Sequence, residues 1–253
     1  MTCHFGDLYA QYYDLLYSDK DYNAEVHYID GLIRSYKTNA KTMLDMGCGT
    51  GKHAELLCEK GYSVHGIDIS YEMLKVAKTR TSGKEDKLYF SQSDIKTLHL
   101  GQRFDVVTSL FHVMSYQTSS EDLYKAFTVA KEHLCEDGIF IFDFWYGPAV
   151  LTDPPVIRVK HLENELTKVT RIAEPILHIK QNVVDVHYDI FIENKVTAII
   201  IEKKELHPMR YFFDIELDII CDTLGFKVIN KLEWMKQSSP NLHSWNVVWI
   251  LQK

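Results

Sequence analysis

The sequence predicts an α/β protein: a doubly wound, mostly parallel sheet that carries an antiparallel β insert after its fifth strand. Three observations lead to this fold. Short apolar segments alternate with helical repeats between residues 39 and 150. Gly47, Gly49 and Gly51 separate the first apolar segment from the helical repeat that follows it. From residue 156 to residue 206 the pattern changes to apolar residues at every second position.

The expected core strands are short and bounded by turn residues or by helical repeats. They are 43–46, 63–68, 88–92, 104–111 and 138–144, with closing strands at 228–232 and 245–251. Helices are expected over 7–17 and 21–36, after Gly51, after Ser70, from Ser120 through Leu134 to about Gly138, and from an N-cap at Asp214 to Gly225. Alternation of strands and helices indicates a parallel sheet covered on both faces.

These patterns divide the chain into four parts. We expect an N-terminal helical lid (1–38), an α/β core (39–150), an antiparallel β insert (151–210) and a segment that completes the core (211–253). In the insert, a turn at 193–195 leads into a strand expected over 196–206. One face of this sheet is apolar and must pack against the body of the domain or a second subunit, so a homodimer through the insert is one expectation.

Composition limits the classes of partner. The chain has 253 residues, a net charge of −7 and five scattered cysteines without a C-x-x-C pair. The negative charge disfavours nucleic acid and anionic membranes, and the cysteine pattern is typical of reduced thiols. No segment reads as a secretory signal or as a membrane span. We therefore expect a cytoplasmic protein. Its twelve histidines show no metal-binding spacing, and no metal site is predicted.

The turn after the first strand has a specific glycine spacing. Glycine tolerates close approach of the backbone to a ligand, and the start of the next helix offers unpaired N–H groups. A dinucleotide site of the form G-x-G-x-x-G would place its third glycine at position 52, which is Lys52. The third glycine is instead Gly51, in the pattern Asp45-x-Gly47-x-Gly49-x-Gly51.

Two carboxylates follow later strands. Asp68 ends the second strand about 20 residues after the glycines, where a carboxylate accepts hydrogen bonds from ribose hydroxyls. A helix-start acid is the structural alternative for this residue. Asp94 follows the third strand, in a Ser-Asp pair that is also ordinary turn chemistry.

The glycine spacing, together with the two acids, resembles the class I S-adenosylmethionine (SAM) methyltransferases, which have a Rossmann-like fold. The resemblance covers about 40–144 and 211–253 and implies SAM as cofactor. It implies that the glycine turn holds the methionine part and the ribose, and that Asp94 accepts from the adenine amino group. The implied cofactor-binding residues are Tyr13, Tyr22, Asp45, Gly47, Cys48, Gly49, Gly51, Asp68, Ile69, Met73, Asp94, Ile95 and Phe111.

Segments outside the core resemble a narrower group, the N-methyltransferases of nucleotide-linked deoxyaminosugars. The similar segments are 13–15, 20–22, 49–53, 144–146, 169–171 and 185–188. The resemblance implies a TDP-, UDP- or GDP-linked amino sugar as substrate. Phe5 stands where that group has a tyrosine, and Tyr116 where it has a histidine; His112 replaces a small residue. The implied substrate-binding residues are Phe5, Tyr9, Tyr17, Trp145, Tyr146, Arg171 and Arg210.

A neutral amine needs little acid–base help, whereas a hydroxyl or carbon acceptor needs a base. His112 and Tyr116, just after the fourth strand, are the candidate catalytic groups, with packing as an equal alternative. Three hypotheses stay open: a SAM-dependent N-, O- or C-methyltransferase of a small molecule, a NAD-dependent enzyme, and a non-catalytic SAM-binding protein.

Overall fold

A computed structural model describes residues 7–253, with side chains from residue 12 onward. The helices are α1 (Asp7–Leu16), α2 (Tyr22–Tyr36), α3 (Lys52–Glu59), α4 (Tyr71–Lys78), α5 (Ser120–Glu132), α6 (Gly147–Thr152) and α7 (Asp214–Leu224). The short 3-10 helices are η1 (Thr79–Thr81), η2 (Val113–Tyr116) and η3 (Ile179–Gln181). The core strands are β1 (Thr42–Met46), β2 (Ser63–Asp68), β3 (Leu88–Gln92), β4 (Phe104–Ser109), β5 (Leu134–Tyr146), β10 (Lys227–Glu233) and β11 (Asn246–Gln252). The predicted α/β class is confirmed.

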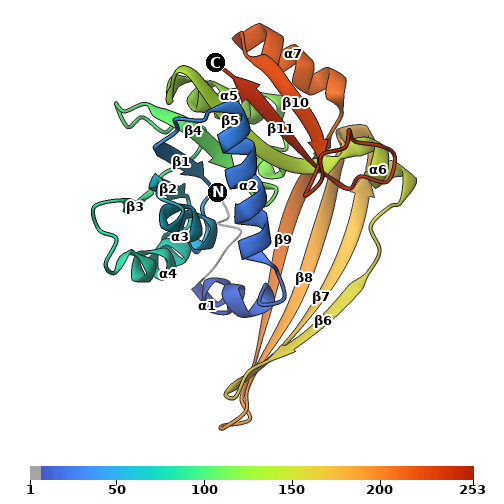
Figure 1. The fold of residues 1–253 in the computed structure, drawn as a ribbon. Coiled ribbons are helices and arrows are strands. Elements are labelled where there is room, and N and C mark those ends of the chain that lie inside the picture. Colours follow the sequence, from blue (N-terminus) through green and yellow to red (C-terminus); the bar gives the residue numbers. More distant parts are fainter. Residues whose placement is uncertain (1–6) are drawn as a thin grey trace.

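The core sheet reverses its strand order between β1 and β4. Strands β3, β2, β1, β4 and β5 are parallel neighbours in that order, and β11 pairs antiparallel with β5 and with β10 (Figure 1). The chain therefore runs from β1 to β3 in one direction and resumes with β4 on the other side of β1. Ligands of doubly wound sheets bind at the carboxyl ends of the strands at such a reversal.

The predicted insert consists of four antiparallel strands, of which the first is short: β6 (Arg158–Glu163), β7 (Thr167–His178), β8 (Val183–Asn194) and β9 (Ile200–Phe212). Its order of hydrogen bonding is β9-β8-β7-β6. The end of β9 pairs in parallel with the end of β5, at 145–146 with 211–212. The insert thus continues the core sheet and curves away from it (Figure 1).

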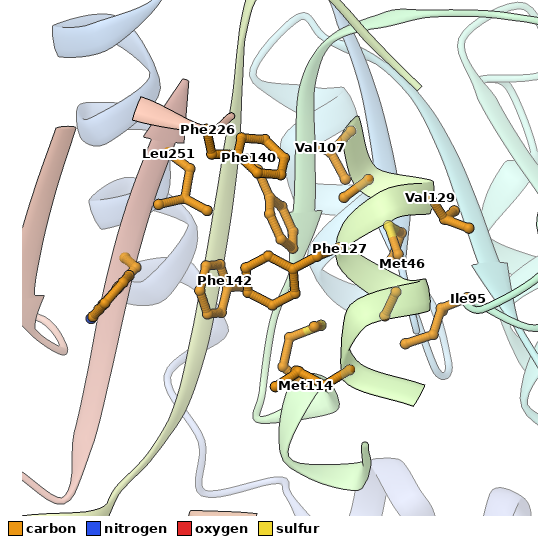
Figure 2. Packing of buried hydrophobic residues seen from close by; sticks show 14 of the residues in the cluster. Met46, Ile95, Val107, Met114, Phe127, Val129, Phe140, Phe142, Phe226 and Leu251 are labelled. Carbon is orange, nitrogen blue, oxygen red and sulfur yellow. The ribbon is translucent and has the colours of Figure 1, made fainter. Parts of the chain in front are cut away.

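Aromatic rings fill the layer between α5 and the sheet (Figure 2). Phe127 of α5 meets Phe142 edge-on at 5.1 Å between ring centroids, and Phe140 at 5.6 Å. Trp249 of β11 is fully buried beside these rings. Edge-to-face pairs of this kind add to the stabilisation from burial. This rigid layer supports β4 and β5, whose carboxyl ends reach the functional site.

The apolar face of the insert packs against the same chain. Ile190 and Ile192 of β8 belong to one buried cluster with Leu16 of α1 and Met73 of α4, and Val184 belongs to a second cluster with Val150 of α6. Helix α1 thus lies between α4 and the insert (Figure 1). Of the two partners expected for this face, the body of the domain is the one observed.

Several predicted boundaries were wrong, and side-chain hydrogen bonds explain two of them. Helix α5 ends at Glu132 rather than near Gly138, and Leu134 begins β5. His133 stops the helix: its Nδ1 lies 2.8 Å from the Val129 carbonyl, while its Nε2 accepts from the Leu100 amide at 3.1 Å. The turn between β8 and β9 extends to 199 because Asn194 Oδ1 accepts the amides of residues 196 and 197.

The predicted N-cap of α7 was displaced by one residue. Phe213 is the N-cap, and its amide donates to Glu216 Oε1 at 2.9 Å. The carboxylate of Asp214 accepts from Tyr146 Oη at 2.7 Å instead. Gly225 ends the helix in the left-handed conformation, as predicted. Among residues 7–253, no helix is long and apolar enough to cross a membrane.

Candidate functional site

A cavity of about 1290 Å³ opens at the carboxyl ends of β1 to β4. Its floor is formed by the segments that follow these strands: 47–50, 68–69, 94–96 and 110–113. Residues of α1 and of the insert form the opposite wall. The cavity therefore occupies the reversal point of the sheet, where the topology predicts a ligand.

The glycine turn presents open backbone to this cavity. Gly47 and Gly49 have φ values of 81° and 55°, in the left-handed region. A Cβ on Gly47 would lie 2.5 Å from the side chain of Val113, whereas a Cβ on Gly49 would meet no atom within 4 Å. Gly47 is therefore required by packing, while Gly49 leaves space that a ligand can occupy.

Asp68 holds the glycine turn in place. Its Oδ2 accepts from the Gly49 amide at 2.9 Å, and its Oδ1 accepts from the Ser70 amide at 2.8 Å. The residue is 8% exposed and lines the cavity. Burial raises the pKa of this carboxyl, and the amide hydrogen bonds partly oppose that shift. A carboxylate oxygen has a second lone pair, so Asp68 can still accept from ligand hydroxyls.

The part of the cavity floor that follows β2 and β3 is lined by apolar side chains and one carboxylate. Ile69, Met73 and Ile95 line the cavity, and Asp94 lies among them. Asp94 Oδ1 accepts from the Lys96 amide at 2.9 Å, which is the turn role considered from sequence. Because the side chain is 21% exposed and faces the cavity, the ligand role is compatible with that turn.

Aromatic residues of α1, of the turn after it and of the start of α2 cover the cavity. Tyr13, Tyr17 and Tyr22 line it, together with Phe111 after β4. The rings of Tyr13 and Tyr17 are 4.7 Å apart, and Tyr17 meets Phe111 edge-on at 5.0 Å. Burial raises the pKa of Tyr13 well above its ordinary value, so its hydroxyl stays neutral.

A buried cluster of ionisable side chains lies beside the start of α3, directly after the glycine turn. Glu25 Oε2 lies 2.6 Å from Lys20 Nζ and 2.8 Å from His53 Nε2. Burial alone would raise the pKa of Glu25, but His53 and Lys20 together bring it below its ordinary value. Lys20 also lies 3.6 Å from the centre of the Phe111 ring. His53, which belongs to the segment 49–53 that resembles the sugar N-methyltransferases, lines the cavity.

The strand predicted over 104–111 ends at Ser109, because Phe111 and His112 both adopt positive φ values. Asp143 of β5, 1% exposed, stabilises this turn by accepting the His112 amide at 3.2 Å. Its Oδ2 also lies 2.7 Å from His112 Nδ1. This distance is short enough for an ion pair, but the orientation of the His112 ring does not meet the geometry of a hydrogen bond. Backbone strain of this kind concentrates at functional sites.

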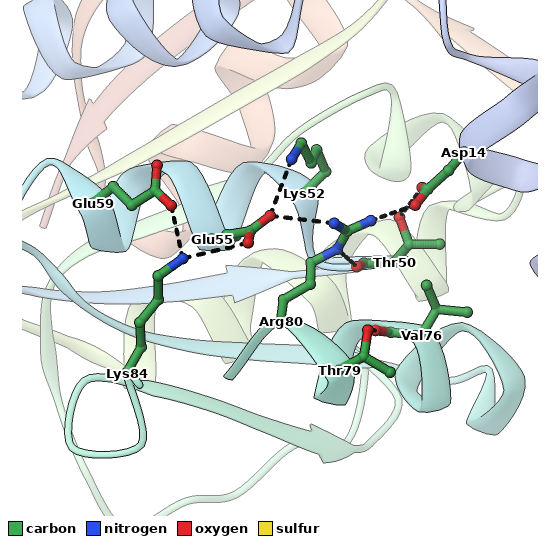
Figure 3. A network of polar contacts seen from close by, with 9 residues as sticks. All are labelled: Asp14, Thr50, Lys52, Glu55, Glu59, Val76, Thr79, Arg80 and Lys84. Atoms are coloured by element: carbon green, nitrogen blue, oxygen red, sulfur yellow. Dashed lines mark hydrogen bonds and ion pairs between the residues drawn. The ribbon is translucent and has the colours of Figure 1, made fainter. Parts of the chain in front are cut away.

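Helix α1 is fastened to the glycine turn by a polar network (Figure 3). Asp14 accepts from Thr50 Oγ1 at 2.8 Å and pairs with Arg80. Arg80 also donates to the Thr50 carbonyl at 2.7 Å and pairs with Glu55 at 3.2 Å. Lys84 meets Glu55 from the other side. The network connects the aromatic cover to the ligand-facing backbone.

Cross-strand register brings one face of the insert to the cavity. Ala173 of β7 is paired with Arg158 on β6 and Tyr188 on β8, and Lys160 is paired with Arg171. Residues paired across strands project to the same face. The residues of the insert strands that line the cavity are Arg158, Val159, Lys160, Arg171, Ala173, Pro175, Val186, Tyr188 and Met209; the segment before β6 adds Asp153, Pro155 and Val156. Tyr116 and Trp145 line the same region from the core.

Two residues predicted to bind cofactor lie outside the cavity lining. Asp45 is 2% exposed and accepts from Thr108 Oγ1 at 2.9 Å, so it joins β1 to β4. Gly51 packs against Phe90: an added Cβ would lie 2.6 Å from its ring. We withdraw direct cofactor contact for both and assign them to the support of the turn.

Two predicted substrate residues are also elsewhere. The Tyr146 hydroxyl donates to Asp214, and burial raises its pKa to about 12. Arg210 pairs with Glu216 at 2.6 Å beside α7. Neither lines the cavity, and we withdraw both. Phe5 lies outside the described residues, and Tyr9 belongs to α1 without a described side chain.

Sequence reasoning missed several residues at the site. Arg158, Lys160 and Tyr188 line the cavity, and His207 contacts Tyr116 from β9. Their position depends on strand register, which no local pattern indicates. Asp143 did leave a signal, since it is the single acid in the apolar strand 139–144.

Comparisons with known proteins agree with this geometry. A model of the methyltransferase domain matches residues 43–138. The dTDP-3-amino-3,4,6-trideoxy-alpha-D-glucopyranose N,N-dimethyltransferase of Streptomyces venezuelae is 27% identical over 222 residues, covering 87% of this chain and 90% of that protein. A methyltransferase of Schizosaccharomyces pombe is 30% identical over 103 residues, and this alignment covers 40% of this chain and 69% of that protein. A SAM-dependent methyltransferase from Clostridium acetobutylicum shares the fold: the TM-score is 0.81 at 21% identity, over 96% of each chain.

A sheet reversed beside β1, with a glycine turn there and an acid after β2, is the arrangement of the class I enzymes. The chain belongs to the SAM-dependent methyltransferases. The residues present fit that cofactor: Gly49 leaves room against the backbone, Asp68 offers a buried acceptor, and Met73 with Ile95 supplies an apolar wall. This membership excludes the alternative hypothesis of a NAD-dependent enzyme.

Proposed function

We propose that the enzyme methylates the amine of a nucleotide-linked deoxyamino sugar. One observation carries the proposal: a single cavity joins the glycine turn to a second region lined by aromatic rings and basic side chains. Its volume exceeds the roughly 300–1,000 Å³ of most small-molecule sites, so it has room for a cofactor and a large acceptor. The printed activity of the Streptomyces venezuelae relative, N,N-dimethylation of a dTDP-linked amino sugar, supports the same substrate class.

The proposed cofactor set is the part of the predicted set that lines the cavity. It consists of Tyr13, Tyr22, Gly47, Cys48, Gly49, Asp68, Ile69, Met73, Asp94, Ile95 and Phe111. Bound SAM would supply an electrophilic methyl group at this end of the cavity. The chain's own contribution is to hold the acceptor in line and to exclude water with the aromatic cover of α1.

The basic edge of the insert suits a diphosphate. Arg158 is exposed on β6, and Lys160 next to it on the same face is held by the Leu16 carbonyl and Asp19. Arg171 donates to the Tyr17 hydroxyl at 3.1 Å and lies 4.8 Å from the Tyr188 ring. Guanidinium groups bind phosphate oxygens by charge-assisted hydrogen bonds. We propose Arg158 in place of Arg210 as the diphosphate contact, with Arg171 beside it.

The test is methyl transfer from labelled SAM to a panel of TDP-, UDP- and GDP-linked amino sugars, followed by mass spectrometry. We expect transfer to at least one member and none to the corresponding hydroxy sugars. Arg158→Met should raise the KM for the nucleotide sugar by about tenfold, the loss of a charge-assisted contact worth about 1.5 kcal/mol. Lys180→Met, an exposed cation outside the cavity lining, is the matched control. Transfer to the hydroxy sugars alone would show an O-methyltransferase, and absence of transfer to every acceptor would leave a SAM-binding protein.

We also propose a homodimer through the far end of the insert. Exposed apolar residues gather at the β8–β9 turn and beside it: Val196 is 76% exposed, Ile200 61% and Leu166 61%. Such patches commonly mark contacts between proteins. Light scattering should give twice the chain mass of 29.5 kDa, and Ile200→Lys should return the monomer. A monomeric unmodified protein would refute this interface.

A cytoplasmic location is the last part of the proposal. The cysteines at 48, 58, 135 and 221 are free in the structure, as expected in a reducing compartment. Cell fractionation of the tagged protein tests it.

A further inference from the structure

Three side chains form a chain of hydrogen bonds that leads away from the cavity. Tyr116, which lines the cavity, has its hydroxyl 2.9 Å from His207 Nδ1. His207 Nε2 lies 3.0 Å from Glu205 Oε2. His207 is 1% exposed and the Glu205 side chain 5%, so the two groups lie beneath the cavity surface.

Strand alternation places the pair behind Tyr116. Glu205 and His207 are two residues apart on β9, so they project from the same face of the insert. Tyr188 is paired with Glu205 across β8 and β9, and its ring packs edge-on against His207 at 4.9 Å. A packed environment of this kind restricts the ring of His207 to one orientation.

The direction of the hydrogen bonds follows from the chemistry of the groups. An ionised Glu205 can only accept, so Nε2 of His207 carries a hydrogen and donates to it. In a neutral imidazole the other nitrogen, Nδ1, must then accept, and the Tyr116 hydroxyl is its donor. A phenolic oxygen can accept while its hydroxyl donates, so the Tyr116 oxygen is able to take a hydrogen bond from a proton donor in the cavity.

We propose that Tyr116, His207 and Glu205 form a proton relay that deprotonates the acceptor amine. An ammonium group of the acceptor passes a proton to the Tyr116 oxygen as the Tyr116 proton moves to His207 Nδ1. The N–H bond of the acceptor breaks, Tyr116 stays neutral, and His207 becomes an imidazolium beside the Glu205 carboxylate. After the product leaves, the proton returns through Tyr116 to solvent in the cavity. The amine lone pair is then free to attack.

Two features favour this role over simple packing. Glu205 Oε1 is buried and accepts no hydrogen bond from the described residues, so its charge gains from a protonated His207 nearby. Burial raises the pKa of Tyr116 well above its ordinary value, which makes the neutral hydroxyl a carrier of protons rather than a phenolate. The ionisable groups that act on Tyr116 are Tyr188 of β8, Tyr17 after α1, Glu205 of β9 and Asp68 after β2.

The relay rests on the proposed function, because it needs an acceptor that binds as an ammonium ion. Its kinetic test uses dTDP-3-amino-3,4,6-trideoxyglucose and SAM with Tyr116→Phe and His207→Gln. We expect kcat to fall by about a hundredfold at a pH near 6.5, the size of a general-base contribution, and by less than about threefold near 9.5, where the free amine is already neutral. The KM for SAM should stay within about twofold. An equal loss at both pH values would indicate a structural role and overturn the relay, as would full activity of either variant.

A matched control separates the relay from loss of a buried imidazole contact. His178 on β7 also meets an acid, with Nε2 3.0 Å from Asp185 Oδ2, outside the cavity lining. His178→Gln should leave kcat unchanged at both pH values. Glu205→Gln keeps an acceptor for Nε2 but removes the charge, and should show a loss smaller than that of His207→Gln with the same pH dependence.

Nitrogen-15 NMR of the histidine rings tests the relay without substrate or cofactor. We expect His207 as the Nε2–H tautomer, and Tyr116→Phe should move its Nδ1 resonance while leaving that of His178 in place. The Nδ1–H tautomer would reverse the hydrogen bonds and overturn the relay. If the unmodified enzyme methylates no amino sugar, the proposed function fails by itself, and this spectrum alone decides whether the relay exists.

Discussion

The Gly49 amide donates to Asp68 Oδ2 at 2.9 Å, so the glycine turn and the acid after β2 form one unit. Asp68 shapes the ligand-facing backbone and also faces the cavity itself. Sequence spacing suggested only the second of these roles. A change at Asp68 should therefore affect both the turn and the ligand.

Asp68→Ala should weaken SAM binding by more than about tenfold, because the variant loses an acceptor and releases Gly49; tenfold corresponds to about 1.4 kcal/mol. Isothermal titration calorimetry measures the affinity. Asp86→Asn, an exposed acid in the turn before β3, is the control and should bind as the unmodified protein does. Unchanged affinity of Asp68→Ala would remove Asp68 from the cofactor site.

Gly49→Ala and Gly51→Ala should separate ligand contact from packing. Both positions have positive φ, which costs a residue with a Cβ about 1–2 kcal/mol. Gly51→Ala also forces a Cβ against Phe90, for about 1–3 kcal/mol more. We expect Gly51→Ala to show the larger fall in Tm, and Gly49→Ala the larger loss of SAM affinity at temperatures where both are folded. Phe90→Leu should restore part of the Tm of Gly51→Ala, and equal effects of the two glycine variants would contradict these assignments.

Arg80→Met should loosen α1 from the glycine turn. Arg80 contacts Asp14, the Thr50 carbonyl and Glu55, whereas Lys84 contacts only the Glu55 and Glu59 side of the network (Figure 3). Hydrogen exchange should speed up in residues 7–16 of Arg80→Met and stay unchanged there in Lys84→Met. Partly exposed ion pairs contribute little, so global stability should fall by less than about 1 kcal/mol. Equal exchange in both variants would show that α1 is held by its apolar contacts alone.

Asp45→Asn should change the pH dependence of stability. Burial raises the pKa of Asp45, so the folded state holds its proton at higher pH than the unfolded state does. Stability contributed by this group is therefore lost as pH rises from the unfolded pKa through the folded pKa. The variant keeps an acceptor for Thr108 and should be the more stable protein at pH about 7.5. The difference in Tm between the two proteins should shrink as pH falls toward about 4, and a constant difference would contradict the prediction.

Local patterns predicted most core elements, because amphipathic repeats and glycine or serine boundaries act over a few residues. Ser70 caps α4 by accepting the Met73 amide, and Gly225 ends α7, both as expected. Two of the boundaries that failed depended on partners distant in sequence. His133 ends α5 through the Leu100 amide, and Asp214 is engaged by Tyr146.

The sequence by itself determined the alternation of strands and helices, the glycine turn and the acids after β2 and β3, because these depend on neighbours in the chain. Only the tertiary structure decided that the insert continues β5, that its register brings Arg158 and Tyr188 to the cavity, and that His207 lies behind Tyr116. The tertiary structure also places Tyr146 and Arg210 outside the cavity lining, where they bind Asp214 and Glu216 of α7. The reason is physical: a shift of one residue in strand register moves every side chain to the opposite face, and no local pattern specifies which neighbour a strand will meet.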